Sequence, residues 1–449
     1  MLRKLSLTLN SKKIQVINIV PGSGGSFYCG NCLRDSEYLQ GLKKAGVEVL
    51  KVPMYLPIFA DEHDLEEVPV FYGAISLYLK HSYPIFRKAP GWVDKILNSG
   101  PALRFAAGMA GSTNAKGLED MTISMLLGEA GDQKRELEHM IDWLEKYCHA
   151  DIVHLSNALL IGLARRVKER LGVKVICSLQ DEDVWVDAMD EDFKRKTWDL
   201  MKERARDVDA FFAVSEYFAR QMQPLLNIPD EKLFVQHIAV DPADYTYLNS
   251  SGKPLNIGYI SRMCASNGLE VLLDAFIILK KNPEWNKTRL VITGGSTGDD
   301  AAFLRAMRKK IERAGIVSEV EFHKDFEAGR HEFFKKVALI SVPVLKGEAF
   351  GMYLLESMAS GVPVVQPALG AFPEIIERSG GGITYQPNTP EKLAKAWSEL
   401  LGNRDKLRFL SSAGREGIEQ KFNIHRRSGE IVGLYNKLIN RPNADNHVA

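Results

Sequence analysis

Residues 347–365 constrain the fold of this chain more than any other stretch of the sequence. They follow an apolar run at 338–342 that has the composition of a buried parallel strand. After a loop with a glycine near each end, the pattern predicts a helix from 352 to 360, ended by Gly361. Residues 362–365 predict the next strand. A strand, a glycine loop, a helix and a second strand form the repeating unit of an α/β fold.

Two carboxylates lie in this unit, Glu348 in the loop and Glu356 on the helix. Such a loop lies at the carboxyl end of a parallel strand, where open α/β sheets bind ligands. The free amides of a helix N-terminus favour a phosphate, whereas ionised carboxylates repel phosphate and accept hydrogen bonds from sugar hydroxyls. A ligand with both a diphosphate and a sugar is therefore expected. An ordinary βα turn with two solvated glutamates is the alternative, since one glycine-rich turn is a weak signal.

The whole stretch closely resembles the Glu-x7-Glu signature of the retaining family 4 glycosyltransferases, which have the GT-B fold. The residues on that pattern are Glu348, Phe350, Gly351, Glu356, Met358, Ala359, Gly361 and Pro363. The resemblance implies that Glu348 contacts the donor sugar and that Glu356 holds the ribose hydroxyls. It also implies that four loop amides approach the donor diphosphate, those of Ala349, Phe350, Gly351 and Met352.

Length and composition limit the classes of protein. A chain of 449 residues is too long for one hydrophobic core, so two domains are expected. A net charge near +1 argues against a general nucleic-acid binder. Five cysteines, an odd number, indicate a reducing compartment without a disulfide framework. Neither a signal peptide nor a run of ~20 apolar residues is evident, so we expect a cytoplasmic protein.

Strands alternate with helices on both sides of a linker, which predicts two Rossmann-like, doubly wound domains that face a central cleft. We expect an acceptor domain over 1–246 and a nucleotide-sugar donor domain over 254–422. By resemblance to GT-B enzymes, a C-terminal helix over 423–449 packs back on the first domain. These features together define the GT-B fold class.

The alternation stops near 54–132, where aromatic residues and prolines predict a helical insertion that shapes the acceptor site. Basic residues lie beside the aromatics there, and a solvated basic face is their ordinary interpretation. Contact with anionic lipid at the inner membrane face is the alternative. The basic residues are Lys80, Arg87, Lys88 and Lys95.

The resemblance assigns further donor-binding residues. Gly24 and Gly25 match a glycine pair that approaches the donor across the cleft. Arg262 matches a strand-end arginine, whose charge stabilises the leaving diphosphate. A salt bridge at the domain surface is the alternative role for Arg262. Gly294, at the end of the next predicted strand, completes the group.

The chain departs from the family pattern at three places. Asn267 stands where the family has a lysine, and the lost charge-assisted hydrogen bond weakens donor binding by about 1.5–3 kcal/mol. Gln180 stands where a histidine positions the sugar; it can bond a hydroxyl but cannot take up a proton. Residues 238–239 are Ile-Ala, where the family commonly has Asn-Gly.

The resemblance implies metal-independent, retaining transfer of a sugar from a nucleoside-diphosphate sugar, with no cofactor. The acceptor is a carbohydrate, a lipid-linked molecule or a small molecule. The predicted catalytic residues are Glu348, Arg262 and Gln180. Because of the departures, a non-catalytic GT-B protein that binds a nucleotide sugar or a partner is the main alternative. A sugar-nucleotide epimerase or a phosphorylase is another.

Three other patterns have weaker support. The acidic triplets at 181–183 and 190–192 resemble the Asp-x-Asp metal motif of the other glycosyltransferase fold, but nothing else indicates a metal. The Cys-x-x-Cys at 29–32 lacks two further zinc ligands, so packing cysteines are expected and a redox role is the alternative. We expect His154 to be a hydrogen-bonded structural residue. The sequence predicts neither the donor base and sugar nor the oligomeric state.

Overall fold

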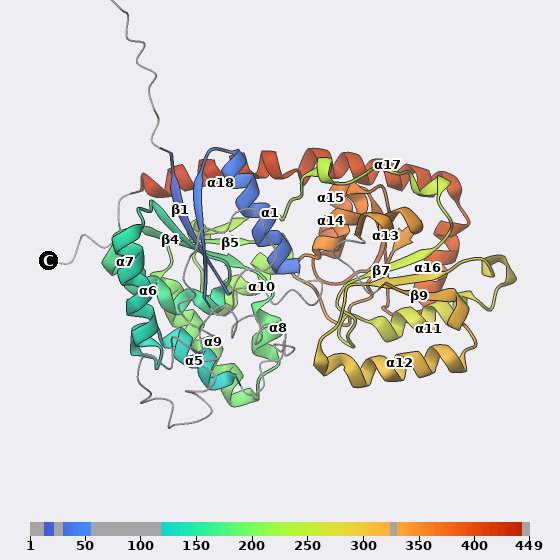
Figure 1. Ribbon diagram of the computed structural model, residues 1–449, viewed down its shortest axis with the longest axis horizontal. Coiled ribbons are helices and arrows are strands. Elements are labelled where there is room, and N and C mark those ends of the chain that lie inside the picture. The colour runs from blue at the N-terminus through green and yellow to red at the C-terminus, as the bar shows by residue number, and fades with distance from the viewer. Residues whose placement is uncertain (1–12, 22–29, 55–117, 324–329, 442–449) are drawn as a thin grey trace, which may run out of the picture.

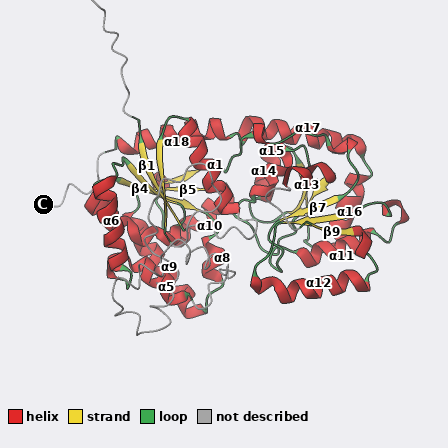
Figure 2. Ribbon diagram, in the orientation of Figure 1, coloured by secondary structure: helices red, strands yellow, loops and turns green. Residues whose placement is uncertain are grey.

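The computed structural model describes residues 13–21, 30–54, 118–323 and 330–441 (Figure 1). Two six-stranded sheets lie side by side, and helices surround both of them (Figure 2). The first sheet has the order β2-β1-β3-β4-β5-β6. Its strands are β1 (Gln15–Val20), β2 (Glu48–Pro53), β3 (Ile152–Leu155), β4 (Lys174–Leu179), β5 (Ala210–Ala213) and β6 (Leu233–Val235).

The second sheet has the order β12-β11-β10-β7-β8-β9. The ladders of both sheets are parallel throughout. The strand order reverses between β1 and β3 and between β7 and β10, so these are the points where an open α/β sheet binds ligands. The strands are β7 (Ile257–Ile260), β8 (Leu290–Thr293), β9 (Val320–Phe322), β10 (Leu339–Ile340), β11 (Val364–Pro367) and β12 (Gly382–Tyr385).

Helices pack on both faces of each sheet, which is why most strands read as continuous apolar runs rather than as alternating ones. Every residue of β3, β5 and β8 is buried. The helices around the first sheet are α1 (Gly30–Lys44), α5 (Glu119–Leu127), α6 (Lys134–Tyr147), α7 (Ala164–Leu171), α8 (Glu182–Asp187), α9 (Glu191–Arg204) and α10 (Glu216–Leu226).

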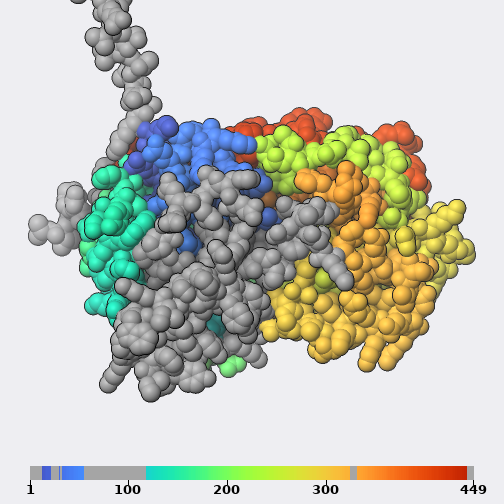
Figure 3. Space-filling view, in the orientation of Figure 1, coloured from blue at the N-terminus to red at the C-terminus, as the bar shows by residue number. Residues whose placement is uncertain are grey.

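The next helices along the chain pack around the second sheet, and in the space-filling view the yellow and orange surface of this domain is continuous (Figure 3). These helices are α11 (Leu269–Leu279), α12 (Ala301–Arg313), α13 (Arg330–Lys336), α14 (Met352–Ala359), α15 (Phe372–Ser379), α16 (Pro390–Leu401) and α17 (Arg404–Lys421). The last helix, α18 (Ile424–Ile439), follows α17 along one edge of the molecule (Figure 1).

Helix α18 returns to the first sheet, where Ile431, Tyr435 and Leu438 join the core beneath α1. The Tyr435 hydroxyl lies 2.8 Å from His154 Nδ1, and His154 Nε2 lies 2.9 Å from Ser178 Oγ. Burial, with the nearby charge of Arg34, lowers the pKa of His154 to about 3. His154 is thus a neutral, hydrogen-bonded structural residue, as expected. The return of α18 to the first sheet confirms the predicted GT-B architecture.

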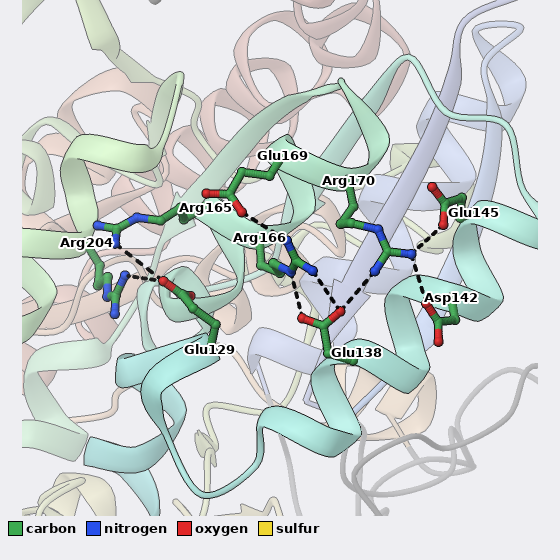
Figure 4. Close-up of polar contacts among 9 residues, drawn as sticks. All are labelled: Glu129, Glu138, Asp142, Glu145, Arg165, Arg166, Glu169, Arg170 and Arg204. Atoms are coloured by element: carbon green, nitrogen blue, oxygen red, sulfur yellow. Dashed lines mark hydrogen bonds and ion pairs between the residues drawn. The ribbon is translucent and has the colours of Figure 1, made fainter.

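Ion pairs hold α6 against α7 on the outer side of the first sheet (Figure 4). Arg166 donates to both oxygens of Glu138, at 2.6 and 3.1 Å. Arg170 donates to the same carboxylate at 2.9 Å and also pairs with Asp142 and Glu145. Such a shared network fixes several side chains at once, which single surface pairs do not.

The predicted insertion near 54–132 lies mostly outside the described residues, and so do its four basic residues. The described last part of the insertion includes the whole of α5, whose residues 122–126 are buried. Within the described ranges, the helices are too short or too polar for any of them to cross a membrane.

Candidate active site

The 347–365 unit has the predicted order of loop, helix and strand, although its strand, β11, runs over Val364–Pro367 rather than 362–365. The loop after β10 leads into α14, whose eight residues are all buried. Gly351 begins the helix with φ of 91°, and Gly361 follows its end with φ of 74°. Both angles lie in the left-handed region that glycine adopts without strain. The two glycines therefore set where the helix starts and stops.

Glu348 projects from this loop with its side chain partly exposed. Its Oε2 accepts a hydrogen bond from the Tyr353 hydroxyl at 2.6 Å, and its backbone carbonyl accepts one from the Ala371 amide at 3.0 Å. Burial and the negative charge of Asp181 raise the pKa of Glu348 to about 8, against the lowering effect of Tyr353. Because Asp181 belongs to the first domain, the two domains bring carboxyl groups toward one another here.

Glu356 lies on α14 and has no exposed surface. Its Oε1 accepts a hydrogen bond from the Tyr245 hydroxyl at 3.3 Å. Tyr245 belongs to the segment between the sheets, where Arg415 of α17 donates to the Tyr245 and Ala359 carbonyls at 3.1 and 2.7 Å. Glu356 is therefore held by a residue of the interdomain segment, and its ribose contact stays a prediction.

Arg262 follows β7 and is bound by Asp300. Its Nε and Nη2 lie 2.9 and 3.0 Å from the two carboxylate oxygens, and Nη2 donates to Thr297 Oγ1 at 2.9 Å. Burial raises the pKa of Asp300, but the bonds to Arg262 and Thr297 outweigh it and bring the pKa below its usual value. The structure thus contains the salt bridge that the sequence offered as the alternative, while the phosphate contact of Arg262 stays a prediction.

Asn267 and Gly294 shape the turn that carries Arg262. The Asn267 amide donates to Ser261 Oγ at 2.9 Å and to the Arg262 carbonyl at 3.2 Å. Gly294 has φ of 119°, and a Cβ there would lie 2.2 Å from the Ser261 carbonyl oxygen. Only glycine allows β8 to end so close to this turn. The Leu345 amide also donates to the Ser266 carbonyl at 2.9 Å, which joins the turn to the loop before Glu348.

Gln180 ends β4 on the first domain and is almost fully buried. Its Nε2 donates to the Ser156 carbonyl at 2.6 Å, whereas its Oε1 has no hydrogen-bond partner among the described residues. The buried Glu182 accepts from the amides of Gln180 and Ala158 at 2.7 and 2.8 Å. Burial raises the pKa of Glu182 to about 8. The acidic triplet at 181–183 thus begins helix α8, with Glu182 turned inward.

The described parts of the chain contain no group of three metal-ligating side chains. Gly24, Gly25 and Cys29 lie outside the described residues. In the Glu348 loop, Ala349 and Phe350 contact the first domain, while the approach of the loop amides to a diphosphate stays a prediction. The Ala349 carbonyl accepts from the Ser215 hydroxyl at 2.6 Å, and the Phe350 ring packs near those of His237 and Phe422.

The structure therefore brings the Arg262 turn and the Glu348 loop to the carboxyl ends of the adjacent strands β7 and β10. Gln180 lies on the first domain, in the same loop as Asp181. Tyr353 and Tyr245, which bond Glu348 and Glu356, were not predicted from the sequence. Tyr353 lies five residues after Glu348, so its nearness in sequence could have indicated the contact. Tyr245 lies 111 residues before Glu356, so no local pattern could have done so.

Two facing α/β domains with a returning C-terminal helix define the GT-B class, and solved structures agree. Sucrose-phosphate synthase from Thermosynechococcus elongatus superposes with a TM-score of 0.69 at 16% identity, covering 95% of this chain and 99% of that one. HepE from Anabaena, solved in complex with UDP, gives 0.63 at 14% identity and covers 95% and 100%. At these identities the likeness shows the fold.

Sequence comparisons give the family. A profile of "Glycosyltransferase Family 4" matches residues 129–244, and one of "Glycosyl transferases group 1" matches 254–403. Together these matches cover more than half of the chain, with one in each domain. The chain belongs to the family 4, group 1 glycosyltransferases.

Individual relatives are distant. The lipopolysaccharide core biosynthesis mannosyltransferase LpsB of Rhizobium meliloti is 26% identical over 192 residues, 41% of this chain and 52% of LpsB. The uncharacterized glycosyltransferase MJ1607 of Methanocaldococcus jannaschii is 23% identical over 327 residues, 69% of this chain and 77% of that protein. A D-inositol 3-phosphate glycosyltransferase of Streptomyces griseus is 31% identical over 145 residues, 32% of this chain and 30% of that protein.

Proposed function

We propose that this protein is a retaining glycosyltransferase that moves a sugar from a nucleoside-diphosphate sugar to a carbohydrate or lipid-linked acceptor without a metal ion. The observation that carries the proposal is the placement of Glu348. Its side chain belongs to the loop after β10 and accepts a hydrogen bond from Tyr353, and the charge of Asp181 in the other domain helps to raise its pKa. A sugar between the domains would meet hydroxyl-binding groups on both sides.

The proposed reaction is the retaining transfer that the family resemblance implies. The acceptor hydroxyl attacks the anomeric carbon on the face from which the diphosphate leaves, so one C–O bond forms as the other breaks. The hydroxyl proton passes to a diphosphate oxygen. Arg262 and the amides at the start of α14 would stabilise the charge that grows on the leaving group. Glu348 would hold the sugar, and Gln180 Oε1, which is buried and has no hydrogen-bond partner among the described residues, would accept from a sugar hydroxyl.

One observation favours a second candidate, a protein that binds a nucleotide sugar without transferring it. Asp300 already engages both Nε and Nη2 of Arg262, and Asn267 supplies no second positive charge. The diphosphate would then gain less from this turn than from an unpaired arginine and a lysine. Such a protein would bind donors weakly and leave them intact.

The test is a transfer assay followed by nuclear magnetic resonance. Purified protein is incubated with UDP, GDP and ADP sugars, with EDTA present, with and without a panel of sugar and lipid-linked acceptors. The proposal predicts acceptor-dependent release of one nucleoside diphosphate and a product with the anomeric configuration of the donor. Inversion would contradict the retaining mechanism, and an epimerised donor formed without acceptor would favour an epimerase. Glu377→Gln, at an exposed position, is the control for Glu348→Gln.

A further inference from the structure

Glu374 of α15 reaches from the second domain to the first. Its Oε1 accepts from the Glu216 amide at 3.0 Å, and its Oε2 accepts from the Tyr217 amide at 3.1 Å. His237 Nε2 lies 2.6 Å from the same Oε1. Both carboxylate oxygens are therefore used by groups that lie 137 to 158 residues earlier in the sequence.

The two amides are the first of helix α10, which lack partners within their own helix. Ser215 caps α10 conventionally and accepts from the Phe218 amide at 3.0 Å. Glu374 completes the cap from across the domain boundary, where the helix dipole favours a negative charge. Burial raises the pKa of Glu374, but His237 and the two amides outweigh it and bring the pKa below its usual value.

Helix α15 also holds the Glu348 loop. The Ala371 amide, just before α15, donates to the Glu348 carbonyl at 3.0 Å. Gly370 has φ of 59°, and a Cβ there would lie 2.4 Å from the Glu348 nitrogen. The N-terminus of α10 meets the same loop directly, because the Ser215 hydroxyl donates to the Ala349 carbonyl at 2.6 Å.

These contacts form a closed path from α10 through Glu374 and α15 to Glu348, and back through Ala349 to Ser215. We propose that Glu374 is a positioning residue: by capping α10 across the domain boundary, it fixes the first domain relative to Glu348, so that a sugar and its acceptor meet in reacting geometry. The expected effect of Glu374 on turnover rests on the proposed function. Its effect on the arrangement of the two domains does not, and it can be measured without any reaction.

The Arg378–Glu216 ion pair between α15 and α10 does not replace the contacts of Glu374. Arg378, one turn later on α15, pairs with Glu216 at 3.3 Å, but its side chain is 40% exposed and that of Glu216 is 44% exposed. Exposed pairs of this kind hold domains weakly. The Glu374 side chain is 13% exposed and makes three bonds to the first domain, so its removal leaves two amides and a histidine without their acceptor.

The experiment compares Glu374→Ala and Glu374→Gln with Glu377→Ala, which changes an exposed glutamate of the same helix. Small-angle scattering of the unliganded protein measures the radius of gyration. Calorimetry measures donor affinity, and steady-state assays measure kcat and the acceptor KM. Circular dichroism confirms that each variant is folded.

Glu374→Ala should increase the radius of gyration and lower kcat about tenfold or more, with donor affinity within about twofold of wild type. Glu374→Gln keeps one acceptor oxygen, so its radius of gyration and kcat should lie between those of wild type and Glu374→Ala. This variant also provides the test if Glu374→Ala does not fold. A radius of gyration and kcat equal to those of Glu377→Ala would overturn the proposal. If the wild type transfers no sugar, the proposed function fails, and scattering alone still decides whether Glu374 holds the domains.

Discussion

Replacing Glu348 by glutamine should change the pH dependence of stability in a defined direction. The pKa of Glu348 rises from its ordinary 4.5 to about 8 in the folded protein, through burial and the charge of Asp181. Between these values the folded protein keeps the proton and the unfolded chain loses it. Stability is therefore lost as pH rises from about 4.5 to about 8. Glutamine stays neutral, so the variant does not lose stability in this way.

The size of the effect follows from the shift. A shift of this size has an upper limit of about 4.8 kcal/mol at 1.36 kcal/mol per pKa unit. Because the Glu348 side chain is partly exposed, solvent screens part of it, and we expect about 2 kcal/mol. In a domain of this size that corresponds to a rise in melting temperature of about 4–8 °C.

The assay is scanning calorimetry of wild type, Glu348→Gln and the control Glu377→Gln at pH 5, 7 and 9. Because two domains need not melt in one transition, the comparison uses the transition of the second domain. The Glu348→Gln variant should melt close to wild type at pH 5 and several degrees higher at pH 9. In the Asp181→Asn background, the difference in melting temperature between Glu348→Gln and its parent at pH 9 should be smaller, because one cause of the raised pKa of Glu348 is removed. A difference in melting temperature between Glu348→Gln and wild type that stays the same at pH 5, 7 and 9 would show that Glu348 does not keep its proton in the folded protein.

Three further predictions follow from the contacts. Arg262→Ala should weaken binding of diphosphates more than of nucleosides in calorimetry, and Asp300→Asn should strengthen diphosphate binding by freeing the guanidinium; equal losses for both ligands would contradict a phosphate contact. Gly370→Ala should lower turnover at least tenfold, because its Cβ would displace the backbone of Glu348; unchanged kinetics would show that the loop tolerates the shift. Glu138→Gln should lower the melting temperature by an amount that shrinks in 1 M salt, at a cost of about 1 kcal/mol; a salt-independent loss would exclude an electrostatic origin.

Much of the fold could be predicted because parallel strands buried on both faces are apolar along their whole length. Helix start and stop residues could also be predicted, because a cap acts on the backbone within a few residues of itself. Gly361 ends α14 in the left-handed region, and Ser215 caps α10 through its own side chain. The signature unit is compact in sequence, so the positions of Glu348 and Glu356 relative to the helix followed directly.

The contacts that complete the site join residues far apart in sequence, and local patterns do not contain them. The pairing of Arg262 with Asp300 spans 38 residues, so the arginine could be singled out but not its partner. Helix α15 buries Phe372, Ile375 and Ile376 at helical spacing, but this local pattern does not indicate which element its polar face meets. Its Glu374 acts on amides of another domain. Glu182 belongs to an acidic triplet, and one of the two backbone amides that it binds, that of Ala158, lies 24 residues earlier in the sequence.

Donor binding can be measured by calorimetric titration of the purified protein with UDP, GDP, ADP and their sugars, repeated with Arg262→Ala and Glu356→Gln. The account predicts selective binding of one nucleotide and its sugar, weakened in both variants, because one residue faces the diphosphate and the other the ribose. Failure of all these ligands to bind the wild-type protein, or binding that both variants leave unchanged, would contradict it.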